Sequence, residues 1–104
     1  MPGPFAEIRI LDCSRGLAGA MATMLFADFE SDVLKVAAPG TPLLPHPGFL
    51  CWDRNKRRLE LDLLTYDGLQ ALRRMVAVAD VAVFDDLPGE LDRLGLDAAT
   101  CLAA

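Results

Sequence analysis

The chain has 104 residues, enough for one small domain, and 53% of them are hydrophobic against 24% charged. That balance is typical of a globular protein and excludes intrinsic disorder. A formal net charge of −5 argues against general affinity for nucleic acid or for an anionic membrane surface. No apolar run reaches the roughly 18 residues that a membrane helix needs. We therefore expect neither a nucleic-acid partner nor a membrane.

The cysteines are odd in number, and their spacing fits neither a metal site nor a C-x-x-C pair: Cys13, Cys51 and Cys101. Reduced thiols of this kind indicate a cytoplasmic protein. The apolar residues 17–27 have the length of a signal-peptide core. The charges that precede them leave no net positive leader, so we expect no signal peptide: Glu7, Arg9, Asp12 and Arg15.

The first third of the chain predicts a strand, a helix and a second strand. A short β-type run covers residues 8–11, good helix formers fill residues 18–29, and a second β-type run covers residues 33–36. Such a βαβ unit is right-handed and parallel in nearly all cases. Its chemistry is expected at the carboxyl end of the first strand, where the helix N-terminus presents free N–H groups.

Residues 38–48 contain four prolines and two glycines, which excludes a helix or an inner strand. This segment is predicted to be a long surface loop that either contacts a ligand or simply connects two elements. It carries His46, the only histidine, between two prolines. With no second candidate ligand nearby, His46 is interpreted as a surface imidazole.

The second half of the chain alternates strands and helices again. We predict a strand at residues 59–61, a helix at residues 66–78 capped by Thr65, and a buried strand at residues 81–84. A short helix then begins at Pro88 and stops at Gly95, and residues 97–104 open another. This alternation predicts an α/β domain with a parallel or mostly parallel sheet and helices on its faces.

Four local features allow a functional and a structural interpretation. The Gly16 and Gly19 pair either binds phosphate or allows tight packing, because it lacks the full G-x-G-x-x-G pattern. Asp85 and Asp86 either bind Mg²⁺ or act as an acid, or they form a turn into the next helix. Cys13 is either a nucleophile or a small buried residue.

The fourth feature is a basic cluster that follows Trp52, made of Arg54, Lys56, Arg57 and Arg58. It either clamps a phosphate through charge-assisted hydrogen bonds, with Trp52 offering a stacking face, or forms a solvated turn before an edge strand.

Several segments together resemble one family, the class III CoA-transferases, which include formyl-CoA transferase, carnitine CoA-transferase and α-methylacyl-CoA racemase. The resemblance covers almost the whole chain in order. It is carried by Arg9-Ile10-Leu11-Asp12, Ser14-Arg15, Ala18-Gly19, Ala22-Thr23, Asp32-Val33-Leu34-Lys35-Val36, Arg54-Asn55-Lys56-Arg57, Leu61-Asp62-Leu63, Ala79-Asp80-Val81 and Pro88-Gly89.

The resemblance implies a Rossmann-like three-layer domain that binds CoA or acyl-CoA, and full-length members that pair as interlocked dimers. It also implies that residues 1–104 form a single N-terminal domain or fragment, truncated before the region that supplies the catalytic aspartate. We therefore expect no catalytic residue and no metal site within the chain. The expected CoA contacts are Arg15, Gly16, Leu17, Ala18, Arg54, Lys56 and Arg57.

The chain also departs from the family pattern. Ala38 stands where an arginine commonly stacks on the adenine, and Ala20 replaces a usual proline. Ala37 replaces an acid, Asp53 replaces an asparagine, and Arg58 replaces a serine. Phe84-Asp85-Asp86 replaces the Glu-Asn-Phe that is common before Pro-Gly. Two hypotheses follow. The chain is the CoA-binding part of a transferase or racemase, acting as a homodimer or with the remainder of a larger protein. Alternatively, it is a degenerate, non-catalytic domain of that fold, kept for packing or protein–protein interaction, with CoA binding weak or lost.

Overall fold

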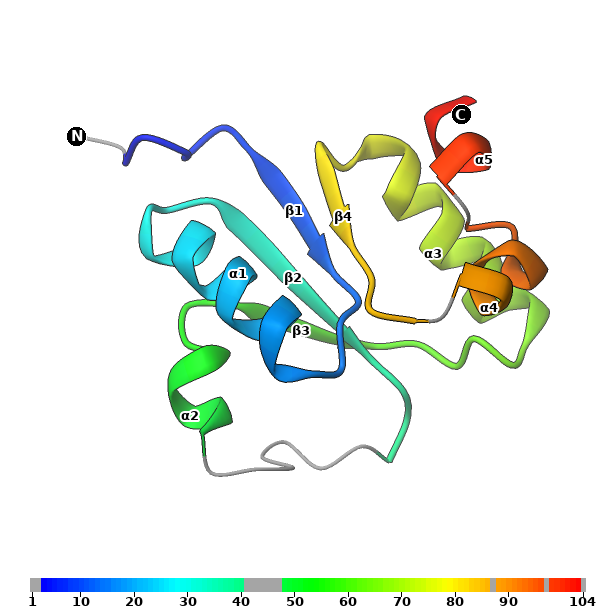
Figure 1. Ribbon diagram of the computed structural model, residues 1–104, viewed down its shortest axis with the longest axis horizontal. Coiled ribbons are helices and arrows are strands. Elements are labelled where there is room, and N and C mark those ends of the chain that lie inside the picture. Colours follow the sequence, from blue (N-terminus) through cyan, green and yellow to red (C-terminus); the bar gives the residue numbers. More distant parts are fainter. Residues whose placement is uncertain (1–2, 41–47, 87, 97, 104) are drawn as a thin grey trace.

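The computed structural model describes residues 3–40, 48–86, 88–96 and 98–103. His46 and most of the proline-rich segment lie outside the described residues. In chain order the elements are β1 (Arg9–Asp12), α1 (Leu17–Asp28), β2 (Asp32–Ala37), α2 (Phe49–Trp52), β3 (Arg57–Glu60), α3 (Tyr66–Val78), β4 (Val81–Val83), α4 (Pro88–Leu94) and α5 (Ala98–Ala103) (Figure 1). Among the described residues, no helix is both long and apolar enough to cross a membrane.

The four strands form one sheet in the order β3-β2-β1-β4, and every neighbouring pair is parallel. This confirms the predicted α/β class and sharpens "mostly parallel" to wholly parallel within the sheet. The order in which strands are added reverses at β1: β2 and then β3 lie on one side of it, and β4 lies on the other. That point is where ligands bind in open α/β sheets, at the carboxyl ends of the strands.

Helices cover both faces of the sheet, because alternate strand residues point to opposite sides. On one face Ile10 and Val33 pack with Ala27 of α1. On the other face Leu11 and Val36 pack with Leu72 of α3 and with Leu96. The three layers are therefore held by two separate apolar clusters, with the sheet between them.

Helix α3 shows how local sequence fixes an element. The side-chain oxygen of Thr65 accepts a hydrogen bond from the N–H of Gly68 at 3.1 Å, as the sequence predicts for an N-cap. Asp67 lies in the first turn, where a negative charge is favourable. The helix places Leu72, which is fully buried, into the core.

Three elements differ from the sequence-based expectation. β4, which was expected as a buried strand, lies at the edge of the sheet, and its Val81 is 40% exposed. The strand expected at residues 59–61 runs over Arg57–Glu60, because Arg57 and Arg58 pair with Leu34 and Lys35 of β2 and extend the ladder backwards. A single helical turn, α2, was not expected; it forms because the N–H groups of Cys51 and Trp52 both donate to the carbonyl of Gly48. The sheet remains wholly parallel in spite of these differences.

Truncating Leu72 should destabilise the domain. We expect Leu72→Ala to lower the free energy of unfolding by about 2–5 kcal/mol, because it leaves a cavity in the α3 core cluster. Leu64, which is 96% exposed, provides the matched control. Leu64→Ala should change the free energy of unfolding by no more than about 0.5 kcal/mol. Urea unfolding followed by circular dichroism measures both, and equal effects would contradict this placement of the core.

Candidate functional site

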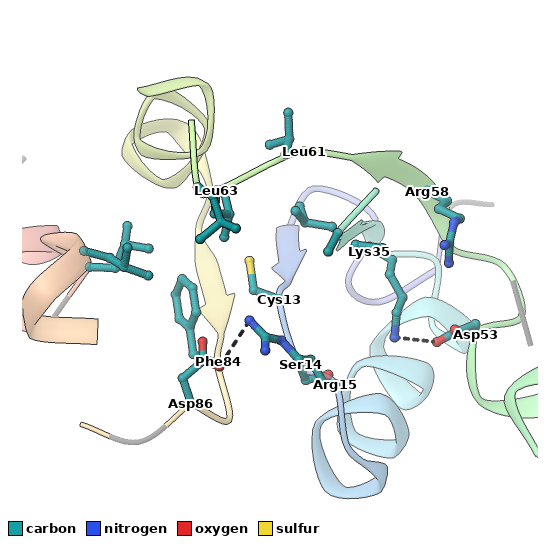
Figure 2. Close-up of a pocket in the computed structure, with 16 residues that line it drawn as sticks. Cys13, Ser14, Arg15, Lys35, Asp53, Arg58, Leu61, Leu63, Phe84 and Asp86 are labelled. Carbon is teal, nitrogen blue, oxygen red and sulfur yellow. Dashed lines mark hydrogen bonds and ion pairs between the residues drawn. The ribbon is translucent and has the colours of Figure 1, made fainter. Parts of the chain in front are cut away.

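A cavity of about 510 Å³ opens at the carboxyl end of the sheet. Its wall comes from the residues that follow β1 and β4, from the carboxyl-terminal half of β2 with Ala38, and from Arg58 of β3. Asp53, three leucines between β3 and α3, and the end of α4 with Leu96 complete it (Figure 2). A volume in this range is typical of sites for small ligands. The cavity lies where the parallel sheet predicts a site, so the fold itself places it.

The cavity has an apolar wall and a charged rim. Leu61, Leu63 and Phe84 are among the residues of its apolar wall. Lys35 and Asp53 form an ion pair at 3.3 Å on one side, and Arg15 and Asp86 form one at 3.6 Å on another (Figure 2). The remaining lining residues are Cys13, Ser14, Val36, Ala37, Ala38, Arg58, Leu64, Leu94 and Leu96.

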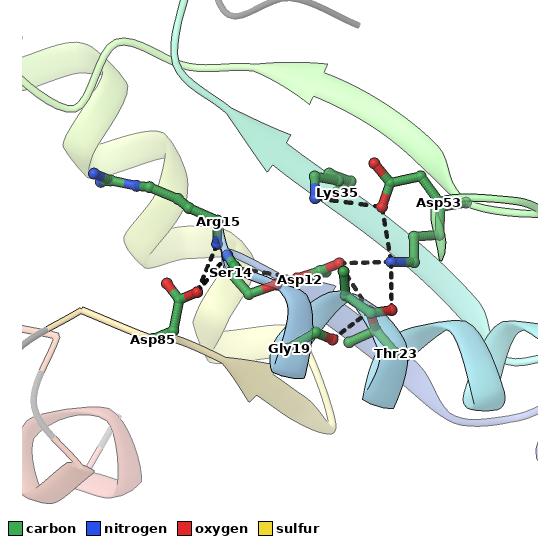
Figure 3. A network of polar contacts seen from close by, with 11 residues as sticks. Asp12, Ser14, Arg15, Gly19, Thr23, Lys35, Asp53 and Asp85 are labelled. Carbon is green, nitrogen blue, oxygen red and sulfur yellow. Dashed lines mark hydrogen bonds and ion pairs between the residues drawn. The ribbon is translucent and has the colours of Figure 1, made fainter. Parts of the chain in front are cut away.

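Beneath the cavity lies a buried polar network centred on Asp12, which is fully buried (Figure 3). Its carboxylate accepts hydrogen bonds from the N–H and hydroxyl of Ser14 and from the hydroxyl of Thr23. The ammonium of Lys56 lies 3.0 Å from Asp12 Oδ2. Burial, the largest single influence, raises the pKa of Asp12. The Ser14 hydrogen bond, the Lys56 charge and the other donors together outweigh it, so the pKa of Asp12 lies below its usual value.

The buried ammonium of Lys56 has three hydrogen-bond partners. Its ammonium donates to Asp12, to the carbonyl of Ala20 at 3.1 Å, and to Asp53 at 3.0 Å. Only 1% of its side chain is exposed. The sequence suggested that Lys56 contacts a phosphate of CoA. In this arrangement its three donors are already directed at protein oxygens, away from solvent.

The rest of the basic cluster also points in different directions. Arg54 makes a two-point contact with Asp28 at the end of α1, with distances of 3.0 and 2.6 Å. Arg57 makes a similar contact with Asp32 at the start of β2, at 3.0 and 2.8 Å. Neither arginine belongs to the cavity wall, whereas Arg58 does. Successive strand side chains alternate in direction, which is why neighbours in the sequence do not gather at one site.

The loop after β1 is held by Asp85. The N–H groups of Arg15 and Gly16 donate to its carboxylate at 2.9 and 2.6 Å (Figure 3). These are two of the backbone groups that the sequence suggested for a phosphate. Asp85 thus tethers the β1 loop, a role that differs from the turn into the next helix that the structural interpretation gave it.

The first helical turn is packed too tightly for side chains larger than hydrogen at Gly19. A Cβ at Gly19 would collide with the side chain of Ser14. The glycine therefore serves the close approach of α1 to the β1 loop. Trp52 lies against Gly48 and does not belong to the cavity wall, so this placement does not support the stacking role that one of the two interpretations gave it.

Cys13 lines the cavity but is not activated as a nucleophile. Burial, followed by the negative charges of Asp12 and Asp86, raises the pKa of the Cys13 thiol to about 12. The thiol is therefore protonated at neutral pH. In the part of the chain that the structure describes, no three metal-ligating side chains come together.

Of the seven residues expected to bind CoA, only Arg15 belongs to the cavity wall. Gly16, Leu17 and Ala18 lie next to it at the start of α1, and Arg54, Lys56 and Arg57 lie elsewhere. Sequence analysis missed Lys35 as a site residue. Its signal was available: Lys35 is the one charged residue in the run Val33 to Ala37, at the carboxyl end of a buried strand.

The model of CoA-transferase family III matches residues 5–104. A succinyl-CoA:glutarate CoA-transferase of Mus musculus is 33% identical over 104 residues, which covers 89% of this chain and 24% of the relative. A succinyl-CoA:mesaconate CoA-transferase of Haloarcula hispanica is 35% identical over 105 residues, covering 88% and 26%. The chain thus spans about a quarter of the length of these relatives.

Solved structures agree. A CAIB/BAIF family protein from Brucella suis superimposes with a TM-score of 0.90 at 28% identity, covering 99% of this chain and 31% of its own. The protein Rv3272 from Mycobacterium tuberculosis superimposes with a TM-score of 0.85 at 30% identity, covering 97% and 30%.

Removing the Lys56 ammonium should destabilise the domain strongly. We expect Lys56→Met to lower the free energy of unfolding by about 3–5 kcal/mol, because it leaves the Asp12 charge buried without its cation. Arg57→Met, which breaks an exposed ion pair, should change it by only about 0–1 kcal/mol. The double variant Asp12→Asn/Lys56→Met should recover part of the loss in urea unfolding. Equal effects of the two single variants would contradict the network.

Cys13 should resist alkylation. At pH 8 a thiol with a pKa of about 12 is ionised on the order of a thousandfold less than a free cysteine. We therefore expect iodoacetamide to modify the exposed Cys51 well before Cys13, as followed by peptide mass spectrometry. Modification of Cys13 should become fast in urea, which serves as the control. Similar rates for the two cysteines in the folded chain would overturn this assignment.

Proposed function

The chain belongs to CoA-transferase family III, and from that premise we propose that it is the N-terminal CoA-binding portion of a class III CoA-transferase or acyl-CoA racemase, catalytically incomplete by itself. The observation that carries the proposal is the cavity of about 510 Å³ at the carboxyl ends of β1, β2 and β4. It combines an apolar wall with lysine and arginine side chains at its rim. This combination suits a ligand that carries both apolar and phosphorylated parts.

In this proposal the anionic part of CoA approaches the start of α1 beside Arg15. Here the N–H groups of Arg15 and Gly16 already donate to Asp85, so a phosphate would have to displace that carboxylate. The N–H groups of Leu17 and Ala18, at the positive end of the helix dipole, support the same approach. The competition with Asp85 predicts weak binding.

Arg54, Lys56 and Arg57 remain part of the proposal only in a rearranged chain. Each would have to leave its present partner, which is Asp28, Asp12 or Asp32 respectively. For the two exposed arginines the free-energy cost of this rearrangement is small, because surface ion pairs contribute little to stability. For the buried lysine it is large. Lys56 is therefore the least suited of the seven to contact a ligand.

The second candidate function is a degenerate domain of the same fold that serves packing or protein–protein interaction. It is favoured by the internal pairing of charges at the cavity, Lys35 with Asp53 and Arg15 with Asp86. We further propose a cytoplasmic location, from the three free cysteines, and an assembly as a homodimer or with the remainder of a larger CoA-transferase-like protein.

Titration calorimetry with CoA separates the two candidates. We expect the chain to bind CoA with a Kd in the high-micromolar range or weaker. Even a millimolar Kd needs about 4 kcal/mol of binding free energy, and a phosphate must first displace Asp85 from the N–H groups of Arg15 and Gly16. Ala38→Arg places a guanidinium on the cavity wall, where it can stack on an adenine, and should tighten binding roughly fivefold or more. Ala77→Arg, on the exposed face of α3, adds the same charge away from the cavity and should have no such effect.

Two results would contradict this account. Absence of heat at millimolar CoA for both the unchanged chain and Ala38→Arg would favour the packing or interaction role. Sub-micromolar affinity of the unchanged chain, lost in Arg57→Ala, would show that the basic cluster rearranges into the site and that the degenerate-domain alternative is wrong.

A further inference from the structure

Two cationic side chains lie next to each other on neighbouring strands at one side of the cavity. Lys35 of β2 is in register with Arg58 of β3, and both residues line the cavity (Figure 2). Their side chains are only 10% and 22% exposed. Like charges at paired positions of two strands repel each other, and solvent screens them little at this exposure. The arrangement therefore favours a negative charge between them.

The neighbouring carboxylates provide part of that charge. Asp53 lies 3.3 Å from Lys35, but the same oxygen also accepts a hydrogen bond from the buried Lys56 at 3.0 Å, so one carboxylate serves two ammonium groups. Arg58 pairs with Glu60 at 3.9 Å, and the side chain of Glu60 is 51% exposed. An ion pair of this kind contributes little to stability, so Arg58 can exchange Glu60 for a ligand at small cost.

The side of the cavity that follows β1 and β4 is more acidic. Arg15 pairs there with Asp86 at 3.6 Å, and Asp85 accepts hydrogen bonds from the N–H groups of the β1 loop. One cation thus accompanies two carboxylates on this side, whereas the β2 and β3 side of the wall has two cations and one carboxylate among the described residues. The ligand group with the largest negative charge is favoured on the β2 and β3 side.

The proposed ligand, CoA, has a group of this kind. Its phosphates form two separate units, a diphosphate linker and a 3′-phosphate on the ribose. The 3′-phosphate is a monoester and carries a charge of about −1.5 to −2 at pH 7, which is more than either phosphate of the diphosphate carries. A guanidinium binds such a group through two parallel hydrogen bonds, and an ammonium adds a point charge.

We infer that Arg58, assisted by Lys35, binds the 3′-phosphate of CoA and makes the cavity selective for CoA over dephospho-CoA. The inference rests on the proposed CoA-binding function and adds the residue that distinguishes these two ligands. Arg58 exchanges Glu60 for the phosphate, while Lys35 stays beside Asp53. The diphosphate then lies closer to the start of α1.

NMR titration of the isotope-labelled chain with CoA and with dephospho-CoA tests the inference, because it measures weak dissociation constants. We expect CoA to bind about tenfold or more tightly than dephospho-CoA, which lacks only the 3′-phosphate. In Arg58→Gln, CoA should bind as weakly as dephospho-CoA, and the affinity for dephospho-CoA should stay unchanged. Arg74→Gln removes the same charge from an exposed position of α3 and should keep the full preference for CoA.

A second variant, Glu60→Gln, tests the same contact by a gain of affinity and keeps the test decisive if Arg58→Gln does not fold. It removes the carboxylate that competes with the phosphate for Arg58. We expect it to tighten CoA binding roughly twofold or more and to leave dephospho-CoA binding unchanged. An unchanged affinity for CoA in Glu60→Gln would count against the inference.

Three further results would overturn the inference and leave the proposed CoA site in place. The first is equal affinity of the unchanged chain for the two ligands. The second is a preference for CoA that survives in Arg58→Gln. The third is an equal loss of affinity for both ligands in that variant, which would place the guanidinium on the diphosphate. Absence of binding of either ligand at millimolar concentration would instead overturn the proposed function, and the inference with it.

Discussion

The buried ion pair between Asp12 and Lys56 is the interaction on which the rest of the site depends. It joins the end of β1 to the residue before β3, and the same ammonium reaches α1 through the carbonyl of Ala20. Two charges this far from water are stable only with full hydrogen bonding, which Ser14 and Thr23 supply to Asp12. The geometry of the β1 loop follows from this requirement.

That network also explains where the positive charges of the chain go. A cluster of four cations in the sequence suggests a single phosphate clamp. In the fold, Lys56 is buried against Asp12, and Arg54 and Arg57 form exposed ion pairs. Of the four, only Arg58 lines the cavity. Two further cations, Lys35 and Arg15, line the same cavity; they are distant in sequence and are brought there because β1 and β2 are adjacent. Both already have carboxylate partners.

The two faces of the sheet have different surroundings. The α3 face ends in an amphipathic helix with a charged exterior, as expected for a surface layer. The α1 face ends in a helix that is apolar on both sides. A helix that is apolar all round is normally buried on all sides, whereas the outer side of α1 is exposed at Leu17, Met21 and Leu25.

The sequence by itself determined the α/β class, the positions of β1, α1, β2, α3 and β4, and the family, because apolar periodicity and caps such as Thr65 are local signals. The sequence placed the start of β3 two residues too late. It gave no sign of α2, because the backbone hydrogen bonds from Cys51 and Trp52 to Gly48 leave no distinct pattern in the sequence. The role of each charged side chain was decided only by tertiary structure. Whether Lys56 meets a ligand or Asp12 depends on strand pairing across 44 residues, which no local spacing reports.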